Sequence, residues 1–296
     1  MKNVAFALAW LAASGVLSAF MALAAESSTS GEAGGTKASA LPKADAILTK
    51  IRDSRYDLAA AGLIRAAAYI RAPEIQATLD PAVRSILRRT RLEAIFVPHK
   101  PVEVKTRKTP SELTAEGRIG VEIYRSLIEA GLRHVTGGLD FAYNIIDPEK
   151  MLVAFDAVVD SGDDGTVEIM LQKKKTRPIK DEDNPAAREY ITIIVGKDGL
   201  LQRVVSVEKG VRTEIGIGNY KHKDRWLFKS VDIAKSDAEG RFLERAVIEI
   251  DYLTVKGIAL PSKISYRALD KDGKPLQRRN EANPVSVEFS DYEVEK

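Results

Sequence analysis

The chain contains no cysteine among its 296 residues. This excludes disulfides, thiolate metal sites and a thiol nucleophile, and it removes the cysteine that carries the lipid anchor of bacterial lipoproteins. Histidine is also scarce, since His99, His134 and His222 are the only three and none has the His-x-x-x-His spacing of a helical metal site. The sequence therefore predicts neither a metal centre nor a cofactor.

Common catalytic signatures are missing as well. The sequence has no Gly-x-Ser-x-Gly elbow, phosphate-binding loop or dinucleotide fingerprint. The acidic run Asp160–Gly165 fails as an EF-hand loop, because position twelve would be Leu171 instead of glutamate. Glu249 and Asp251 share one face of a predicted strand and could form an acid and base pair, but an outward polar face explains them more simply. We predict that the protein is not an enzyme.

The charges nearly cancel, with 45 lysines and arginines against 42 acidic residues, so nothing global indicates nucleic-acid binding. One basic run covers Lys173, Lys174, Lys175 and Arg177 at the end of a predicted strand, where lysines often prevent strand aggregation. The other is an arginine cluster at helical spacing, which is either a solvated helix face or a grip for phosphate headgroups or an acidic partner. This cluster consists of Arg84, Arg88, Arg89 and Arg91.

A long uncharged run occurs only at the N-terminus. After Lys2 no charge occurs until Glu26, and the run ends in small residues, as a secretory signal peptide does. An uncleaved membrane anchor is the alternative, because about 20 apolar residues can span a bilayer. We predict cleavage after Ala24 or Ala25, export to the periplasm, and a flexible linker rich in Ser, Gly and Thr over residues 26–43.

Residues 44–159 are predicted to be rich in helices. Ala44–Arg71 has apolar residues near helical spacing, and three later helix starts pair a capping side chain with a following proline, at Asp80-Pro81, Thr109-Pro110 and Asp147-Pro148. Thr109 also forms a capping box with Glu112. The helix that it opens carries one broad apolar stripe, made of Ile119, Ile123, Tyr124, Leu127, Ile128 and Leu132.

Extended segments are predicted elsewhere. Leu92–Lys105 reads as an edge strand or loop because it contains Pro98 and Pro101. Residues 160–296 read as an antiparallel meander, since turn signals such as Lys197-Asp198-Gly199 and Lys271-Asp272-Gly273 separate the strand runs. The predicted strands are Thr166–Lys173, Tyr190–Val195, Leu200–Glu208, Val211–Asn219, Arg225–Ile233, Arg241–Tyr252, Ile258–Ala268 and Pro284–Val294.

The strands alternate between apolar and polar residues, and the remaining apolar stripes belong to the upstream helices. The predicted fold is therefore α+β, a single domain over residues 44–296 with helices covering one face of a curved antiparallel sheet.

A family resemblance adds to this prediction. The runs Val247–Tyr252, Gly257–Ile264 and Val287–Val294 resemble the C-terminal part of LolA-like outer-membrane lipoprotein-sorting proteins and related envelope lipid-binding proteins. The resemblance covers about Thr166 to Lys296. It implies a half-barrel, an incompletely closed sheet whose concave side holds acyl chains under helices. The region Ala72–Thr109 departs from the pattern and leaves the cargo and delivery partner open.

From the resemblance we expect an exported monomeric carrier of lipid, acylated lipoprotein or another hydrophobic ligand, with a membrane-anchored envelope partner. The alternative is a non-catalytic envelope scaffold that binds its partner through the arginine cluster. The expected ligand-binding residues are Trp226, Phe228, Ile248, Ile250 and Tyr252, and the expected headgroup-binding or partner-binding residues are those of the arginine cluster.

Overall fold

The computed structural model describes residues 41–108, 114–144, 152, 155–162, 164–173, 190–208, 210–276 and 284–296. The predicted signal peptide, most of the predicted linker and the predicted helix start at Asp147-Pro148 lie outside these ranges. So do Lys174, Lys175 and Arg177 of the second basic run. Among the described helices, none combines the length and the apolar character needed to cross a bilayer.

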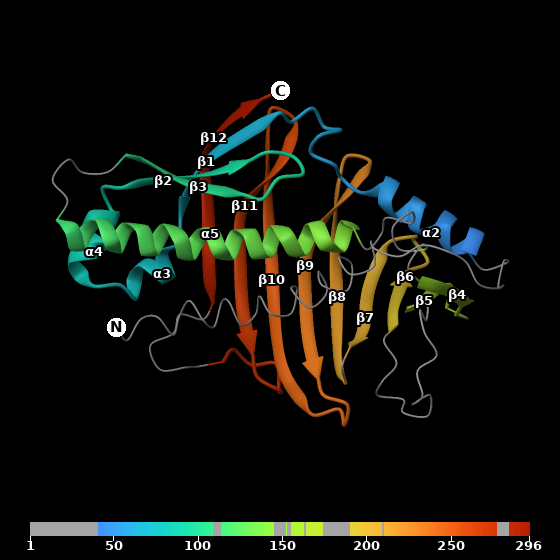
Figure 1. Ribbon diagram of the computed structural model, residues 1–296. Helices are drawn as coiled ribbons and strands as arrows, with labels where there is room; N and C mark the ends of the chain where they lie inside the picture. The colour runs from blue at the N-terminus through green and yellow to red at the C-terminus, as the bar shows by residue number, and fades with distance from the viewer. Residues whose placement is uncertain are drawn as a thin grey trace. The chain divides into compact units, whose positions relative to one another are not determined.

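Twelve strands form one antiparallel sheet (Figure 1) in the order β3-β2-β1-β12-β11-β10-β9-β8-β7-β6-β5-β4. The strands are β1 (Arg65–Arg71), β2 (Arg91–Phe96), β3 (Glu103–Lys108), β4 (Phe155–Ser161), β5 (Val167–Lys173), β6 (Tyr190–Val195), β7 (Leu201–Glu208), β8 (Val211–His222), β9 (Arg225–Ser236), β10 (Phe242–Val255), β11 (Ile258–Leu269) and β12 (Val285–Glu295). The predicted α+β class with a single antiparallel sheet is confirmed. The described sheet is neither closed nor strongly curled, which is less curvature than a half-barrel has.

The eight predicted strands correspond to β5 through β12, with boundaries within three residues of the prediction. The turns explain this agreement, because the glycines expected to end them have positive φ angles of 75° to 78° that only glycine adopts without strain. These glycines are Gly199, Gly210, Gly240 and Gly273.

Four helices accompany the sheet in the described residues: α2 (Leu41–Ser54), α3 (Pro73–Ala77), α4 (Pro81–Leu87) and α5 (Ala115–Asn144). The predicted cap of α4 is confirmed, because the Asp80 carboxylate accepts a hydrogen bond from the main-chain nitrogen of Ala82 at 2.8 Å. The predicted start of the long helix at Thr109-Pro110, with its capping box to Glu112, lies outside the described residues. The described helix α5 begins at Ala115, and the Thr114 hydroxyl accepts a hydrogen bond from the main-chain nitrogen of Gly117 at 3.1 Å.

Two segments that were expected to be helical are strands. Arg65–Arg71 forms β1, which pairs with β2 on one side and β12 on the other, so tertiary pairing overrides the helical propensity of its three alanines. Residues 155–159, the end of the range predicted to be rich in helices, belong to β4 (Phe155–Ser161), which pairs along its length with β5. The extended segment around Pro98 is confirmed, since β2 and β3 lie on either side of it. Of these two strands, β3 lies at the edge of the sheet and β2 does not.

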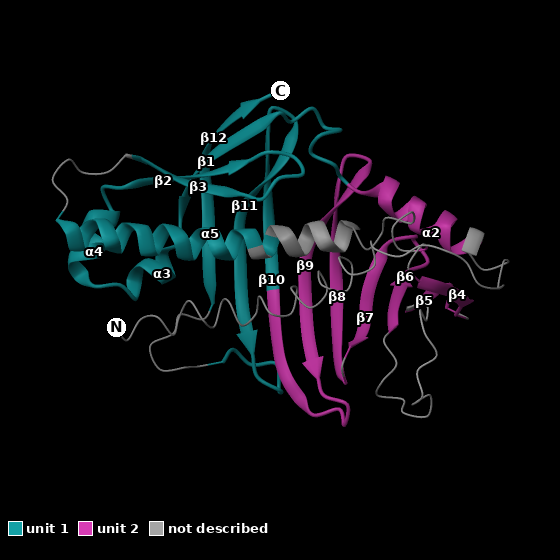
Figure 2. Cartoon of the chain, in the orientation of Figure 1, with its two compact units in different colours: residues 1–17, 56–140, 248–296 teal, residues 18–55, 141–247 magenta. Residues whose placement is uncertain are grey.

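The chain divides into two compact units (Figure 2). Unit 1 holds Tyr56–Asp140 and Ile248–Lys296, and unit 2 holds the described residues up to Arg55 together with Phe141–Val247. The core of unit 2 includes Leu48 and Ile51 of α2, both almost fully buried. Burying each such side chain contributes about 1.5–3 kcal/mol, so α2 is an integral part of unit 2.

Candidate functional site

An apolar layer of unit 1 lies between α5 and the sheet. Five side chains of α5 recur at spacings of three and four residues and are at most 4% exposed. They are Val121, Tyr124, Ile128, Leu132 and Val135. Val104 of β3 and Val102, directly before this strand, are buried next to α5, whereas Glu103 and Lys105 are exposed. The helix therefore covers the apolar face of this edge strand.

Tyr124 is the polar anchor of this layer. Its hydroxyl accepts a hydrogen bond from the main-chain nitrogen of Ala72 at 3.0 Å and donates one to the main-chain oxygen of the same residue at 3.2 Å. Burial raises the pKa of Tyr124 to about 12, although the hydrogen bond to Ala72 opposes that rise. The phenol therefore stays neutral and fixes α5 to the residue that precedes α3.

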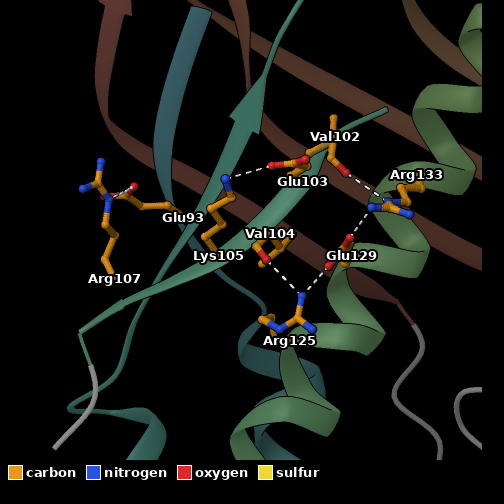
Figure 3. A network of polar contacts seen from close by, with 9 residues as sticks. All are labelled: Glu93, Val102, Glu103, Val104, Lys105, Arg107, Arg125, Glu129 and Arg133. Atoms are coloured by element: carbon orange, nitrogen blue, oxygen red, sulfur yellow. Dashed lines mark hydrogen bonds and ion pairs between the residues drawn. The ribbon is translucent and has the colours of Figure 1, made fainter. Parts of the chain in front are cut away.

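Two arginines of α5 close the rim of the layer (Figure 3). Arg125 Nη1 donates to the main-chain oxygen of Val104 at 3.0 Å, and Arg133 Nε donates to that of Val102 at 3.2 Å. β3 is an edge strand, and such a strand presents every second carbonyl group to solvent or to another chain. The two guanidinium groups therefore occupy acceptors on which a foreign strand could otherwise pair.

Glu129 connects the two arginines. One carboxylate oxygen lies 2.5 Å from Arg125 Nη1 and the other lies 2.5 Å from Arg133 Nη2. The Glu129 side chain is only 16% exposed, so this ion pair is shielded from solvent more than a typical surface pair is. Hydrogen bonding to Glu122, with a further contribution from Glu129, raises the pKa of Arg125. We call Arg125, Glu129 and Arg133 the clasp.

Further ion pairs lie on the polar face of β2 and β3 (Figure 3). Glu93 is 6% exposed and accepts a hydrogen bond from Arg107 Nε at 2.5 Å, which raises the pKa of Arg107. Lys105 lies 3.1 Å from Glu103 and lowers the pKa of that carboxyl. An edge strand with alternating charges resists pairing with other chains, so β3 is protected on its side chains as well as on its carbonyl groups.

The predicted apolar stripe of α5 divides into two ridges. Tyr124, Ile128 and Leu132 are buried, as expected for a helix lying on a sheet. Ile119 and Ile123 are instead 59% and 51% exposed. The apolar surface of α5 is thus wider than the part that the helix buries.

The residues expected to bind a ligand lie in both units. Ile248 and Ile250 of β10 are buried in unit 1, whereas Glu249 and Asp251 between and beside them are exposed, so the predicted alternation is confirmed. Tyr252 is half-buried. In unit 2, Phe228 is 1% exposed and its ring lies 3.8 Å from the Arg55 guanidinium carbon, while Trp226 is half-buried.

The four arginines of the predicted cluster do not share a helix face. Only Arg84 lies within α4, because the helix ends at Leu87 and Thr90 donates its hydroxyl hydrogen to the main-chain oxygen of Ile86. Arg88 caps the helix, Arg89 follows it, and Arg91 begins β2. The guanidinium carbon of Arg91 lies 5.4 Å from the centre of the Tyr69 ring, and its Nη2 lies 4.0 Å from the Asp291 carboxylate. The prediction that the four arginines lie along one helix is therefore wrong.

The described side chains show no arrangement suited to metal binding, since no group of three or more histidine and acidic residues gathers among them. Glu249 forms an ion pair with Arg267 at 2.8 Å. The arrangement found in unit 1 consists of an apolar layer, one buried phenol and the clasp.

The clasp was not predicted from the sequence. Glu122, Arg125, Glu129 and Arg133 follow one another at spacings of three and four residues, and this pattern indicates ion pairs along a helix. No local pattern reveals that Arg125 and Arg133 also reach the carbonyl groups of Val104 and Val102, which lie 21 and 31 residues earlier in the chain.

No family model, curated protein or solved structure matches this chain. The resemblance of the C-terminal strands to lipoprotein-sorting proteins therefore stays a prediction.

Proposed function

We propose that the protein is an exported, non-catalytic carrier that holds an acyl chain or a similar hydrophobic ligand between α5 and the sheet of unit 1. This is the helix-over-sheet arrangement of the lipoprotein-sorting proteins that the C-terminal strands resemble. The observation that carries the proposal is an apolar helix face closed at its rim by the clasp.

The attachment of α5 suits a cover that opens. Its hydrogen bonds to the rest of unit 1 include those made by three side chains, Tyr124, Arg125 and Arg133. Side-chain bonds of this kind contribute about 0.5–3 kcal/mol each, so they can be exchanged against ligand contacts. An acyl chain gains about 0.8 kcal/mol for each methylene that it buries, and several methylenes offset the loss of the clasp.

The test is equilibrium binding of a fluorescent fatty acid to the chain that begins at Glu26, which keeps every described residue. Ile128→Trp adds bulk to the fully buried ridge of α5, and Ile123→Trp adds the same bulk to the exposed ridge as a matched control. The proposal predicts saturable binding by the parent chain and by Ile123→Trp, and at least tenfold weaker binding by Ile128→Trp.

Overpacking at Ile128 also destabilises the fold, by about 1–3 kcal/mol. A second measurement therefore uses the parent chain alone: a bound ligand raises the unfolding midpoint as its concentration rises. Absence of saturable binding, together with an unchanged midpoint, contradicts the carrier function and favours the envelope scaffold.

A further inference from the structure

The β8–β9 hairpin of unit 2 (Figure 2) has a tip that combines cations with aromatic rings. The tip covers Tyr220 to Trp226, and the two strands stay paired down to His222 and Arg225. Pairing of β8 with β7 ends at Gly216, so β8 continues for six residues without that neighbour. The hairpin end therefore extends beyond the last rung that it shares with β7.

The base of the tip is held firmly. Asn219 Nδ2 donates to the main-chain oxygen of Leu201 at 3.0 Å. On the β9 side, the main chain of Arg55 bridges to that of Trp226, and the Arg55 guanidinium covers the Phe228 ring. Because Phe228 and Arg55 are both buried, the tip is presented on a rigid support.

The two aromatic side chains lie on opposite faces of the hairpin at nearly the same distance from its turn. Tyr220 pairs with Leu227 and Lys221 pairs with Trp226, which are consecutive rungs of the ladder. Side chains of consecutive residues point to opposite faces of a strand, so the phenol and the indole flank the hairpin. Tyr220 is 43% exposed and Trp226 is half-buried.

The turn itself is cationic. Lys221, Lys223 and Arg225 are all exposed, and Asp224 is the single acidic residue among them. The Lys221 ammonium lies 5.7 Å from the Trp226 ring centre, so charge and ring stay close together.

We propose that this tip docks on the surface of an anionic phospholipid bilayer. Tryptophan and tyrosine prefer the boundary between headgroups and acyl chains, and lysine and arginine attract anionic headgroups. Rings on both faces at one depth match a planar boundary, whereas a protein groove would contact one face. The inference goes beyond carriage, because it concerns unit 2 and requires no bound ligand.

Trp226 supplies the readout. The chain has two tryptophans, and the other is Trp10 in the predicted signal peptide. In the chain that begins at Glu26, Trp226 is therefore the sole source of tryptophan fluorescence. Vesicles of phosphatidylglycerol mixed with phosphatidylcholine are titrated into the protein, and vesicles of phosphatidylcholine alone serve as the neutral surface.

Docking predicts a blue shift of Trp226 emission, and quenching by brominated acyl chains, with the anionic vesicles. Each cation near such a surface strengthens binding by about fivefold, so the triple variant Lys221→Glu, Lys223→Glu and Arg225→Glu should lose at least a hundredfold. The matched control reverses Lys197, Lys271 and Lys274, three exposed turn lysines elsewhere, and should bind within about threefold of the parent.

The parent chain alone gives a second test that needs no variant. Salt screens exposed charges, so raising the ionic strength from about 0.05 M to about 0.5 M should release the protein from the vesicles. No emission shift with anionic vesicles, an equal shift with neutral vesicles, or equal losses in the two triple variants would overturn the proposal. Docking without fatty-acid binding would support this inference while contradicting the carrier function.

Discussion

Arg125 Nη1 donates a hydrogen bond to the main-chain oxygen of Val104 at 3.0 Å, so a side chain of α5 occupies an acceptor of the edge strand β3. Arg133 donates likewise to the main-chain oxygen of Val102, the residue directly before β3. The same contacts therefore close the apolar layer under α5 and protect the sheet edge from pairing with another chain.

Glu129 holds both arginines in place, which leads to a prediction about stability. Glu129→Gln should lower the free energy of unfolding by about 1–3 kcal/mol, because it leaves two guanidinium groups close together without their shared, shielded carboxylate. Glu122→Gln is the matched control, since Glu122 also contacts Arg125 but its side chain is 59% exposed. Its cost should stay below about 0.5 kcal/mol. Equal costs in urea unfolding would show that the clasp is an ordinary surface pair.

Opening the sheet edge should promote self-association. The double change Arg125→Met and Arg133→Met keeps apolar length but frees the carbonyl groups of Val102 and Val104. Sedimentation velocity should then show concentration-dependent oligomers that the parent chain does not form. Arg118→Met, at an exposed position of the same helix, should leave sedimentation unchanged. An unchanged distribution for the double variant would mean that the charged side chains of β3 protect the edge alone.

Stability should fall at alkaline pH through Tyr124. Its pKa is 10.0 when unfolded and about 12 when folded, so the unfolded chain releases the phenol proton first. The contribution of this group is complete below pH 10 and is lost as the pH rises to about 12, at most about 3 kcal/mol in all. Tyr292 adds to the same loss, because burial raises its pKa too. In Tyr124→Phe the decline between pH 10 and 12 should be shallower; an unaltered slope would contradict the burial of this phenol.

Glu74 and Ser286 lie 212 residues apart and join α3 to β12. The carboxylate accepts from the Ser286 main-chain nitrogen at 3.1 Å and from its hydroxyl at 2.9 Å. Glu74→Ala should lower the free energy of unfolding by about 1.5–3 kcal/mol, because it leaves both buried donors without that acceptor. Ser286→Ala removes only the hydroxyl and should cost less, as thermal unfolding can show. A larger loss of stability in Ser286→Ala than in Glu74→Ala would contradict the role of the Glu74 carboxylate as the acceptor for both donors.

The sequence indicated the strands from β5 onward because their boundaries are marked locally, as by Gly199 and Gly273. The predictions that failed depend on contacts between residues far apart in the sequence. The alanines of Arg65–Arg71 favour a helix, yet this segment is a strand that pairs with β12, where Arg65 lies opposite Glu295 near the other end of the sequence. A pairing partner 230 residues away leaves no trace in a local pattern.

For a similar reason, only part of the candidate site could be predicted from the sequence. The apolar residues of α5 are visible in the sequence, but the depth at which each one lies depends on the docking of the helix, which buries Ile128 and exposes Ile123. The arginine cluster was misread because periodicity from Arg84 to Arg91 does not reveal that α4 stops at Leu87.

Native mass spectrometry shows whether the protein carries a hydrophobic ligand. The protein is expressed with its own N-terminal segment and purified from the periplasm without detergent. We expect a mass corresponding to cleavage after Ala24 or Ala25, together with an adduct of lipid size that collisional activation releases. A processed mass without any adduct, which stays unchanged after incubation with fatty acid, would contradict the carrier function.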